Sequence, residues 1–237
     1  MVALALLTEF HPAYSHGIAG NRYFAGTLTF DDPAVADEAI LPYYTHLEYT
    51  TLGSTVVENR FDWTFARLFT PTLAVTLDSG WIHQNWPVGH TSGFATTDVG
   101  LKYEAYRDNQ HEALVSVGIA WGIGRTGAQR VGADEPNTVQ PGIFFGKGFG
   151  DLPDSLSWFR PFAITGAVVS ETPVGSAGKA LAPNPTTGKF GSVLIPAVET
   201  INWGFSIQYS TLYLTSRFTG GPPKAEPLNQ LVPLVEF

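Results

Sequence analysis

The sequence predicts an all-β fold, an antiparallel transmembrane β-barrel whose strands follow one another as an up-and-down meander. Three observations predict it. Large apolar residues recur at every second position in nine segments. The positions between them carry small or sparsely charged residues, and the links between segments alternate between short and long. Since a strand shows alternate residues to opposite faces, each segment has one apolar and one polar side.

Residues 112–124, EALVSVGIAWGIG, show this alternation most clearly. Large residues from Val115 to Ile123 occupy every second position and include Trp121. The positions between them hold Gly, Ala and Ser, with Leu114 as the large exception. A soluble sandwich would place its polar faces in water, where Lys and Glu are common. Small residues instead suit the crowded interior of a barrel whose apolar side faces lipid.

Eight further segments repeat the period of two. Segments of about ten alternating residues, separated by turns, are the signature of a transmembrane barrel. The seventh segment along the chain is the least regular of the nine. The eight lie at 43–51, 55–68, 72–83, 96–106, 139–150, 158–171, 200–216 and 229–237.

The links between the segments alternate in length, as expected for short periplasmic turns and longer outer loops. The short links are 69–71, 107–111 and 151–157, and the long ones are 84–95, 125–138 and 172–193. The brief link at 52–54 and the longer one at 218–228 break the rule. Nine strands is an odd number, whereas bacterial barrels are usually even. We therefore expect a barrel that is incomplete at its C-terminal end, unless the weaker segment 22–30 supplies another strand.

Composition excludes several classes of protein. The chain has 237 residues and a formal net charge of −8, and it lacks a basic stripe, which argues against nucleic acid as a partner. Without cysteine it forms neither disulfides nor thiolate metal sites. No apolar run approaches the roughly 20 residues of a membrane helix. A chain of this kind crosses a bilayer only as a closed barrel, in which every backbone polar group is paired.

The chain divides into three parts. Residues 1–15 are interpreted as a degraded signal peptide, with small residues at Ala13 and Ser15 ahead of a cleavage point but without a basic start. The alternative is an ordinary disordered N-terminus. Residues 16–38 form an N-terminal extension, in which Asp-Asp-Pro at 31–33 favours one short helical turn. The barrel domain covers 39–237.

Charged residues interrupt the polar faces of four consecutive strands. In a narrow lumen, opposite charges on neighbouring strands would form a paired ladder that sets ion selectivity. The alternative is that these charges only hydrate and brace the interior. The lumen candidates are Glu48, Glu58, Arg60, Asp62, Asp78, Asp98, Lys102 and Glu104.

Aromatic residues gather near the strand ends, where a membrane barrel carries a girdle at each interface. The alternative is that they are core aromatics of a soluble sandwich. One predicted girdle contains Trp81, Trp86, Phe94, Trp121 and Trp203, and the other contains Phe69, Tyr106, Trp158 and Phe159.

No motif points to a catalytic step, and we expect no enzyme, no cofactor and no metal site. The segment 142–148, GIFFGKG, is one residue short of a phosphate-binding loop and has Gly148 where that loop needs Ser or Thr. It is better explained as a Gly-rich strand with close backbone approach. Ser176 has no identifiable base, and the six histidines form no HExxH.

Several stretches resemble a family of Gram-negative outer-membrane proteins, the transporter-like barrels grouped with the meta-pathway phenol-degradation protein. They are 21–38 (NRYFAGTLTFDDPAVADE), 57–81, 96–108 and 229–237 (NQLVPLVEF). The resemblance implies a bacterial outer-membrane location, with the lipid bilayer and lipopolysaccharide as partners. It also implies passage or sensing of small hydrophobic or aromatic compounds, and no catalytic residues.

The pattern and the resemblance together predict an outer-membrane channel or transporter for small molecules. Three alternatives stay open. The first is a structural or adhesive barrel without transport, the second an esterase-like barrel, and the third a soluble β-sandwich that binds a ligand. The oligomeric state is not predicted.

Overall fold

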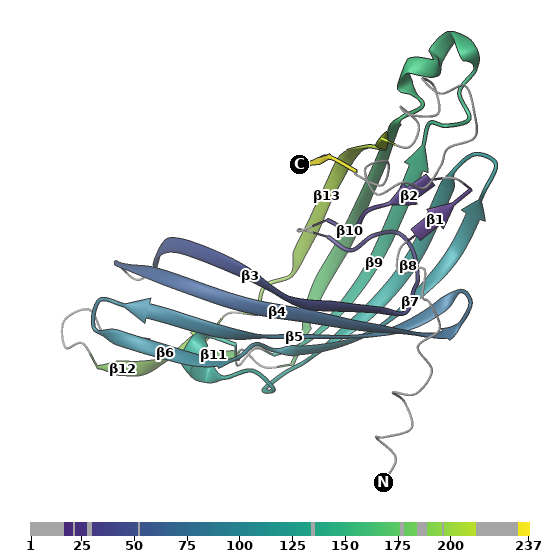
Figure 1. Cartoon of the computed structure of the whole chain (residues 1–237). Coiled ribbons are helices and arrows are strands. Elements are labelled where there is room, and N and C mark those ends of the chain that lie inside the picture. The colour runs from purple at the N-terminus through teal and green to yellow at the C-terminus, as the bar shows by residue number, and fades with distance from the viewer. Residues whose placement is uncertain are drawn as a thin grey trace.

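The computed structural model shows a long antiparallel sheet that curls around a short N-terminal segment (Figure 1). The main sheet has ten strands. The structure describes residues 17–20, 22–27, 30–51, 53–133, 136–175, 178–183, 189–195, 197–211 and 232–237.

The strands of the main sheet follow one another as the predicted meander, which confirms the all-β antiparallel fold. Their spatial order is β14-β13-β10-β9-β8-β7-β5-β4-β3, with β6 folded back on β5. Each of the nine predicted segments overlaps one of these strands. The bounds are β3 (Glu38–Thr51), β4 (Ser54–Thr70), β5 (Leu73–Trp86), β6 (Gly89–Phe94), β7 (Thr97–Asp108), β8 (Ala113–Ile123), β9 (Asn137–Gly148), β10 (Phe162–Val174), β13 (Thr200–Tyr209) and β14 (Leu234–Glu236).

The sheet curls without closing. Among the residues that the structure describes, β3 pairs only with β4, and β14 pairs only with β13 (Figure 1). The architecture is therefore a half-barrel with a convex outer surface and a concave inner surface.

The two ends of the half-barrel differ, as the link lengths predict, except that the predicted short link 151–157 was wrong, because thirteen residues, 149–161, separate β9 from β10. At the short-link end, two residues separate β4 from β5, and four separate β7 from β8. The long-link end carries β6, the 3₁₀ helix η2 (Gln129–Val131) and a separate hairpin of β11 (Gly178–Pro183) and β12 (Phe190–Ile195). The long links thus contain strands and a helical turn that the period-two pattern did not predict.

Two predicted elements were wrong. Asp-Asp-Pro starts no helix. A carboxylate oxygen of Asp32 does accept the backbone N–H of Ala34 at 2.8 Å, but residues 31–37 continue without a helical turn. The strand predicted from residue 158 begins at Phe162, because the 3₁₀ helix η3 (Asp154–Phe159) precedes it.

Segment 22–30 does not add a strand to the main sheet. Its described residues contribute β2 (Arg22–Phe24), which pairs with β1 (Gly17–Ala19) in a small sheet of its own. This small sheet lies against the main sheet near its short-link end (Figure 1).

The outer surface of the half-barrel is apolar. Residues that pair across neighbouring strands point to the same face. Phe65 pairs with Leu77, which pairs with Val99, and Val99 pairs with Trp121. All four side chains are exposed, and Phe65 is 48% exposed. In β4, β5, β7 and β8 the alternation that the sequence shows therefore leaves the large apolar residues outside the curve.

The inner surface, by contrast, buries polar residues. Its side chains are covered by the N-terminal segment and by the long links, so they are shielded without an apolar core. The buried polar and charged residues on the described inner surface include Glu58, Gln84, Lys102, Glu104, Ser116, Thr165, Ser206 and Gln208.

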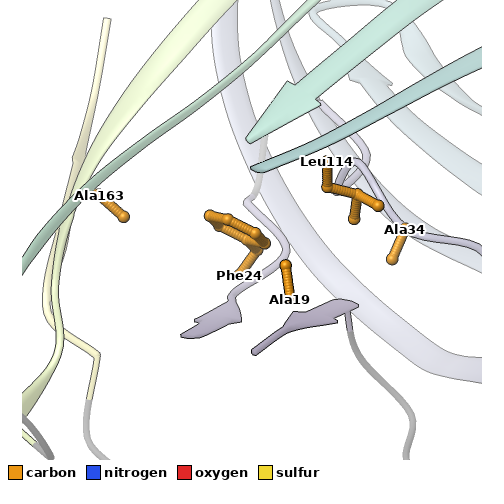
Figure 2. Close-up of a cluster of buried hydrophobic side chains, with 5 residues drawn as sticks. All are labelled: Ala19, Phe24, Ala34, Leu114 and Ala163. Carbon is orange, nitrogen blue, oxygen red and sulfur yellow. The ribbon is translucent and has the colours of Figure 1, made fainter. Parts of the chain in front are cut away.

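Two small apolar clusters of described residues lie inside the curve. One joins Ala19, Phe24 and Ala34 of the N-terminal segment to Leu114 and Ala163 of the sheet (Figure 2). A second cluster, at the long-link end, consists of Ile82, Ala95, Val131 and Ala133.

Candidate functional site: a polar inner surface filled by the N-terminal segment

The described residues between 17 and 37 (17–20, 22–27 and 30–37), here called the plug segment, fill the short-link half of the inner surface. Phe24 is fully buried between the two sides of the curled sheet (Figure 2). A Cβ on Gly146 of β9 would lie about 3 Å from atoms of Phe24 and Pro33, so the wall has no spare room there. The plug segment is therefore part of the folded interior.

Arg22 is the main polar anchor of the plug segment. Its Nε donates to Glu112 Oε2 at 3.1 Å, and its two terminal nitrogens donate to the backbone carbonyls of Pro161 at 3.0 Å and Arg160 at 2.6 Å. The side chains of Arg22 and Glu112 are 1% and 7% exposed. Burial lowers the pKa of the Arg22 guanidinium, and the nearby Glu112 carboxylate opposes that shift. We call Arg22, Glu112 and the two backbone carbonyls that Arg22 binds the latch.

The backbone around Glu112 is shaped for the latch. Glu112 has a positive φ of 49°, which is uncommon for a residue other than glycine. Its carboxylate also accepts the backbone N–H of Gly150 at 2.9 Å. A Cβ on Gly148 or Gly150 would lie 2.3 Å from a carboxylate oxygen of Glu112. The glycines of this strand end thus permit the close approach that the sequence predicts, although the approaching group is a side chain.

Lys102 of β7 provides a second anchor, nearer the middle of the sheet. Its ammonium group donates to Asp31 Oδ2 at 2.6 Å and to the backbone carbonyl of Asp32. It also lies over the ring of Phe144 at 4.5 Å. A lysine that is almost fully buried is thus paired with charge from the plug segment.

Further hydrogen bonds complete the contact between plug segment and sheet. The side chain of Gln208 accepts the N–H of Ala25 at 3.2 Å and donates to its carbonyl at 2.9 Å. Ser116 donates to the carbonyl of Pro33. At the last residue of the segment, Asp37 accepts the backbone N–H of Leu68 at 2.7 Å.

The long links cover the other end of the inner surface. Gln129 of η2 donates to the hydroxyl of Ser192 in β12 at 3.0 Å. The ring of Trp86, at the tip of β5, meets that of Phe190 edge-on at 6.3 Å. Val131 packs on inward-facing Ile82. Both ends of the curve are therefore occupied.

A charged group of β4 lies beneath the long links. Glu58 accepts hydrogen bonds from Tyr49 and Gln84, each at 2.9 Å. Arg60 lies 3.8 Å from Glu58 and 3.3 Å from Asp62, and its Nε has no hydrogen-bond partner among the described residues. The side chain of Arg60 is 36% exposed, so these contacts hold it only loosely.

Seven of the eight predicted lumen residues lie on the inner surface. Asp78 accepts a hydrogen bond from Thr64 at 2.5 Å, and Glu104 binds Arg107 through two bonds of 2.6 and 2.5 Å. Most of these charges are paired, some along one strand and Lys102 with the plug segment. The seven are Glu58, Arg60, Asp62, Asp78, Asp98, Lys102 and Glu104.

The prediction that Glu48 faces the lumen was wrong, because this residue lies on the outer surface. The register pairs it with Val57, whereas its neighbour Leu47 pairs with Glu58 of the inner surface. The tight turn between Thr51 and Ser54 fixes this register. Strand β3 carries large residues on both faces, so its alternation alone does not reveal which face is inward.

The structure places the predicted girdle residues in several different locations. Trp81, Trp121 and Trp203 lie on the outer surface toward the long-link end, while Phe69 and Tyr106 lie at the short-link end. Trp158 and Phe159 are exposed but belong to η3. Trp86 has the inward parity of Gln84 and belongs to the contact between the long links, so its assignment to a girdle is corrected.

Aromatic and polar residues form successive rows on the outer surface of β3 to β6. One row runs Tyr44, Phe61, Trp81 and Phe94, with ring centroids 5.2 Å apart for the first pair and 4.9 Å for the last. The next row toward the long-link end is polar and runs His46, Asn59, His83 and Ser92. The apolar surface therefore ends in aromatic rings and then in hydrogen-bonding groups.

Sequence reasoning missed the latch and the plug segment. Arg22 and Glu112 are 90 positions apart. Glu112 stands at the very start of the segment 112–124, before its alternation of large and small residues begins. One signal was present, because glycine recurs at 146, 148 and 150 beside a charged lysine. That glycine pattern indicates that another part of the protein approaches the end of this strand closely, but it does not identify which part.

Comparison of the chain with protein-family models, with curated proteins and with solved structures yields no match. In the part of the chain that the structure describes, no helix is long and apolar enough to cross a membrane. The same residues contain no group of three or more His, Cys, Asp or Glu side chains arranged to hold a metal ion.

Proposed function

We propose that this protein is an outer-membrane β-barrel that acts as a channel or transporter for small molecules. The observation that carries the proposal is the inverted distribution of its side chains. Exposed Leu, Val, Phe and Trp cover the outer surface, while Glu58, Lys102 and Glu104 are buried on the inner one. A soluble protein gains stability by the opposite arrangement, since apolar burial drives folding in water. Lipid tails would satisfy the outer surface.

The rows on β3 to β6 support a membrane boundary at the long-link end. Trp and Tyr concentrate where the hydrocarbon core meets the headgroups. The row of Tyr44, Phe61, Trp81 and Phe94 has this composition, and the histidine row beyond it suits the headgroup region. Lipopolysaccharide and phospholipid would then be the surrounding partners. The family resemblance points to the same location.

A sheet within a bilayer has no open edge, because each unpaired backbone group costs several kcal/mol there. The proposal therefore includes strands that pair with β3 and with β13 in the membrane. Their addition would convert the half-barrel into a closed barrel. The charged inner surface would then line the solute path and set which ions enter.

One observation favours a second candidate, a structural barrel without transport. The plug segment and the long links occupy both ends of the described inner surface. If neither moves, the interior is sealed. The seal would make the protein a membrane scaffold.

Two measurements test the proposal. The full chain is folded into detergent or lipid, and its electrophoretic migration is compared with and without boiling, because a folded barrel migrates differently from its boiled form. Planar bilayers then record conductance. Discrete current steps support the channel, and silent insertion supports the scaffold. Material that stays dissolved and monomeric in plain buffer would rule out both.

A further inference from the structure

We propose that the plug segment is a releasable gate that closes the short-link mouth until the latch opens. This inference rests on the proposed channel, since a gate needs a path to close. It assigns a role to the plug segment, which neither the strand pattern nor the girdles explain.

The path of the plug segment allows withdrawal. Near its start, Arg22 binds groups of the β7–β8 turn and of the β9–β10 link, all at the short-link end. At its close, Asp37 binds Leu68 near the end of β4, at the same end. The segment thus enters and leaves through one mouth. It can move out as a loop, without threading a terminus through the barrel.

The contacts of the plug segment are mostly polar. The apolar cluster beneath it contains five side chains, of which three are alanines. Burial of the three alanines contributes little, so Phe24 and Leu114 supply most of the apolar stabilisation of this contact. The stronger contacts are the latch and the ion pair of Lys102 with Asp31. Water and ions can replace contacts of this kind, whereas a large apolar interface would bind the segment permanently.

The inner surface of the sheet behind the plug segment carries polar side chains that could hydrogen-bond to water. Thr165 and Ser206 share a hydrogen bond of 2.7 Å, and Gln208 donates to both hydroxyls at 3.2 Å. These groups lie on adjacent strands and form a network among themselves. Release of the segment would therefore expose these hydrogen-bonding groups, beside the apolar side chains of Leu114 and Ala163.

A reversible lock tests the gate, and the absence of native cysteine makes it unambiguous. Ala34 and Leu114 belong to the same buried cluster, one on each side of the contact (Figure 2). In the full chain, Ala34→Cys with Leu114→Cys is bridged by a short bifunctional thiol reagent that a reductant cleaves. Ala34→Cys alone receives the same treatment as the control. We expect current steps from the control and from the cleaved form, and none from the bridged form.

The latch supplies the opposite perturbation. Arg22→Ala should raise the fraction of time spent open by about tenfold or more, because it removes a buried charge pair. Equal conductance of bridged and cleaved forms would overturn the gate and leave the channel standing. Silence of every inserted form would instead overturn the channel.

A second measurement decides the gate even if no current flows. Ser116 is fully buried under Pro33, so Ser116→Cys should react slowly with a water-soluble maleimide. We expect Arg22→Ala to speed this reaction about tenfold or more, for the same loss of charge pairing. Thr55→Cys, at the exposed β3–β4 turn, provides the reference rate. An unchanged rate at position 116 would show that the plug segment does not open at the latch.

Discussion

Neutralising Glu112 should release the plug segment, and the structure allows the size of the effect to be worked out. Glu112→Gln keeps the shape of the side chain but leaves the guanidinium of Arg22 buried beside a neutral group. The two side chains are 1% and 7% exposed, so water screens little of the loss. Removing one partner of a buried ion pair costs roughly 3–5 kcal/mol. The carbonyls of Pro161 and Arg160 still accept from Arg22, which favours the lower end of that range.

Trypsin provides the assay, because it cleaves after arginine and Arg22 is enclosed in the folded chain. When opening and closing are fast compared with cleavage, the cleavage rate follows the population of the open form. Each 1.4 kcal/mol changes that population about tenfold, so 3 kcal/mol predicts cleavage at Arg22 roughly 100 times faster. Mass spectrometry of the released N-terminal peptide measures the rate.

Glu48→Gln is the matched control for this prediction. It makes the same chemical change on the exposed outer surface, where Glu48 pairs with Val57. A surface substitution of this kind shifts stability by about 0.5 kcal/mol or less, so its cleavage rate should stay within about threefold of the parent. If Glu112→Gln also changed the rate by less than threefold, the latch would not be what holds the plug segment.

Three further predictions test the outer surface, the inner charges and the glycines. Leu77→Arg, on the exposed apolar surface, should lower the free energy of unfolding in lipid vesicles by about 2–4 kcal/mol. Asn85→Arg lies farther along the same strand, beyond the aromatic row, and should lower it by about 1 kcal/mol or less. Equal losses of stability would contradict the proposed membrane boundary. Arg60→Glu should raise the preference for cations over anions, measured as a reversal potential under a salt gradient, without changing insertion; an unchanged potential would show that Arg60 does not face the path. Gly148→Ala would place a Cβ 2.3 Å from the carboxylate of Glu112 and should expose the plug segment to trypsin. Gly26→Ala is the control, because its Cβ would meet nothing within 4 Å and should leave the segment protected. If both variants resisted trypsin, the close approach of Glu112 to residue 148 would not require glycine.

The strands were predictable because their signal is local. In β8 every second residue is large, and the register of β7 and β9 confirms the face that Trp121 and Ile119 share. The period of two needs no knowledge of distant residues. The same reasoning failed for Glu48, since β3 has Tyr43 and Tyr44 on opposite faces and its alternation carries no direction. There the turn and the pairing with β4, which are not local properties, decide the face.

The plug segment was not predictable because its contacts join residues about 70 to 180 positions apart, such as Lys102 with Asp31 and Gln208 with Ala25. Yet the sequence indicates the position of the plug segment indirectly, through the small residues that face it. The sequence predicts that the small residues line the crowded interior of a barrel, and in the structure they leave the room that the plug segment needs. Gly146 accommodates Phe24, and Gly148 accommodates the latch. A polar face built from small residues therefore predicts an interior that something must enter, and only the charges around it indicate whether water or polypeptide does so. Here Lys102 and Glu112 face opposite charges from the plug segment, which favours polypeptide in the resting state and water once those pairs are broken.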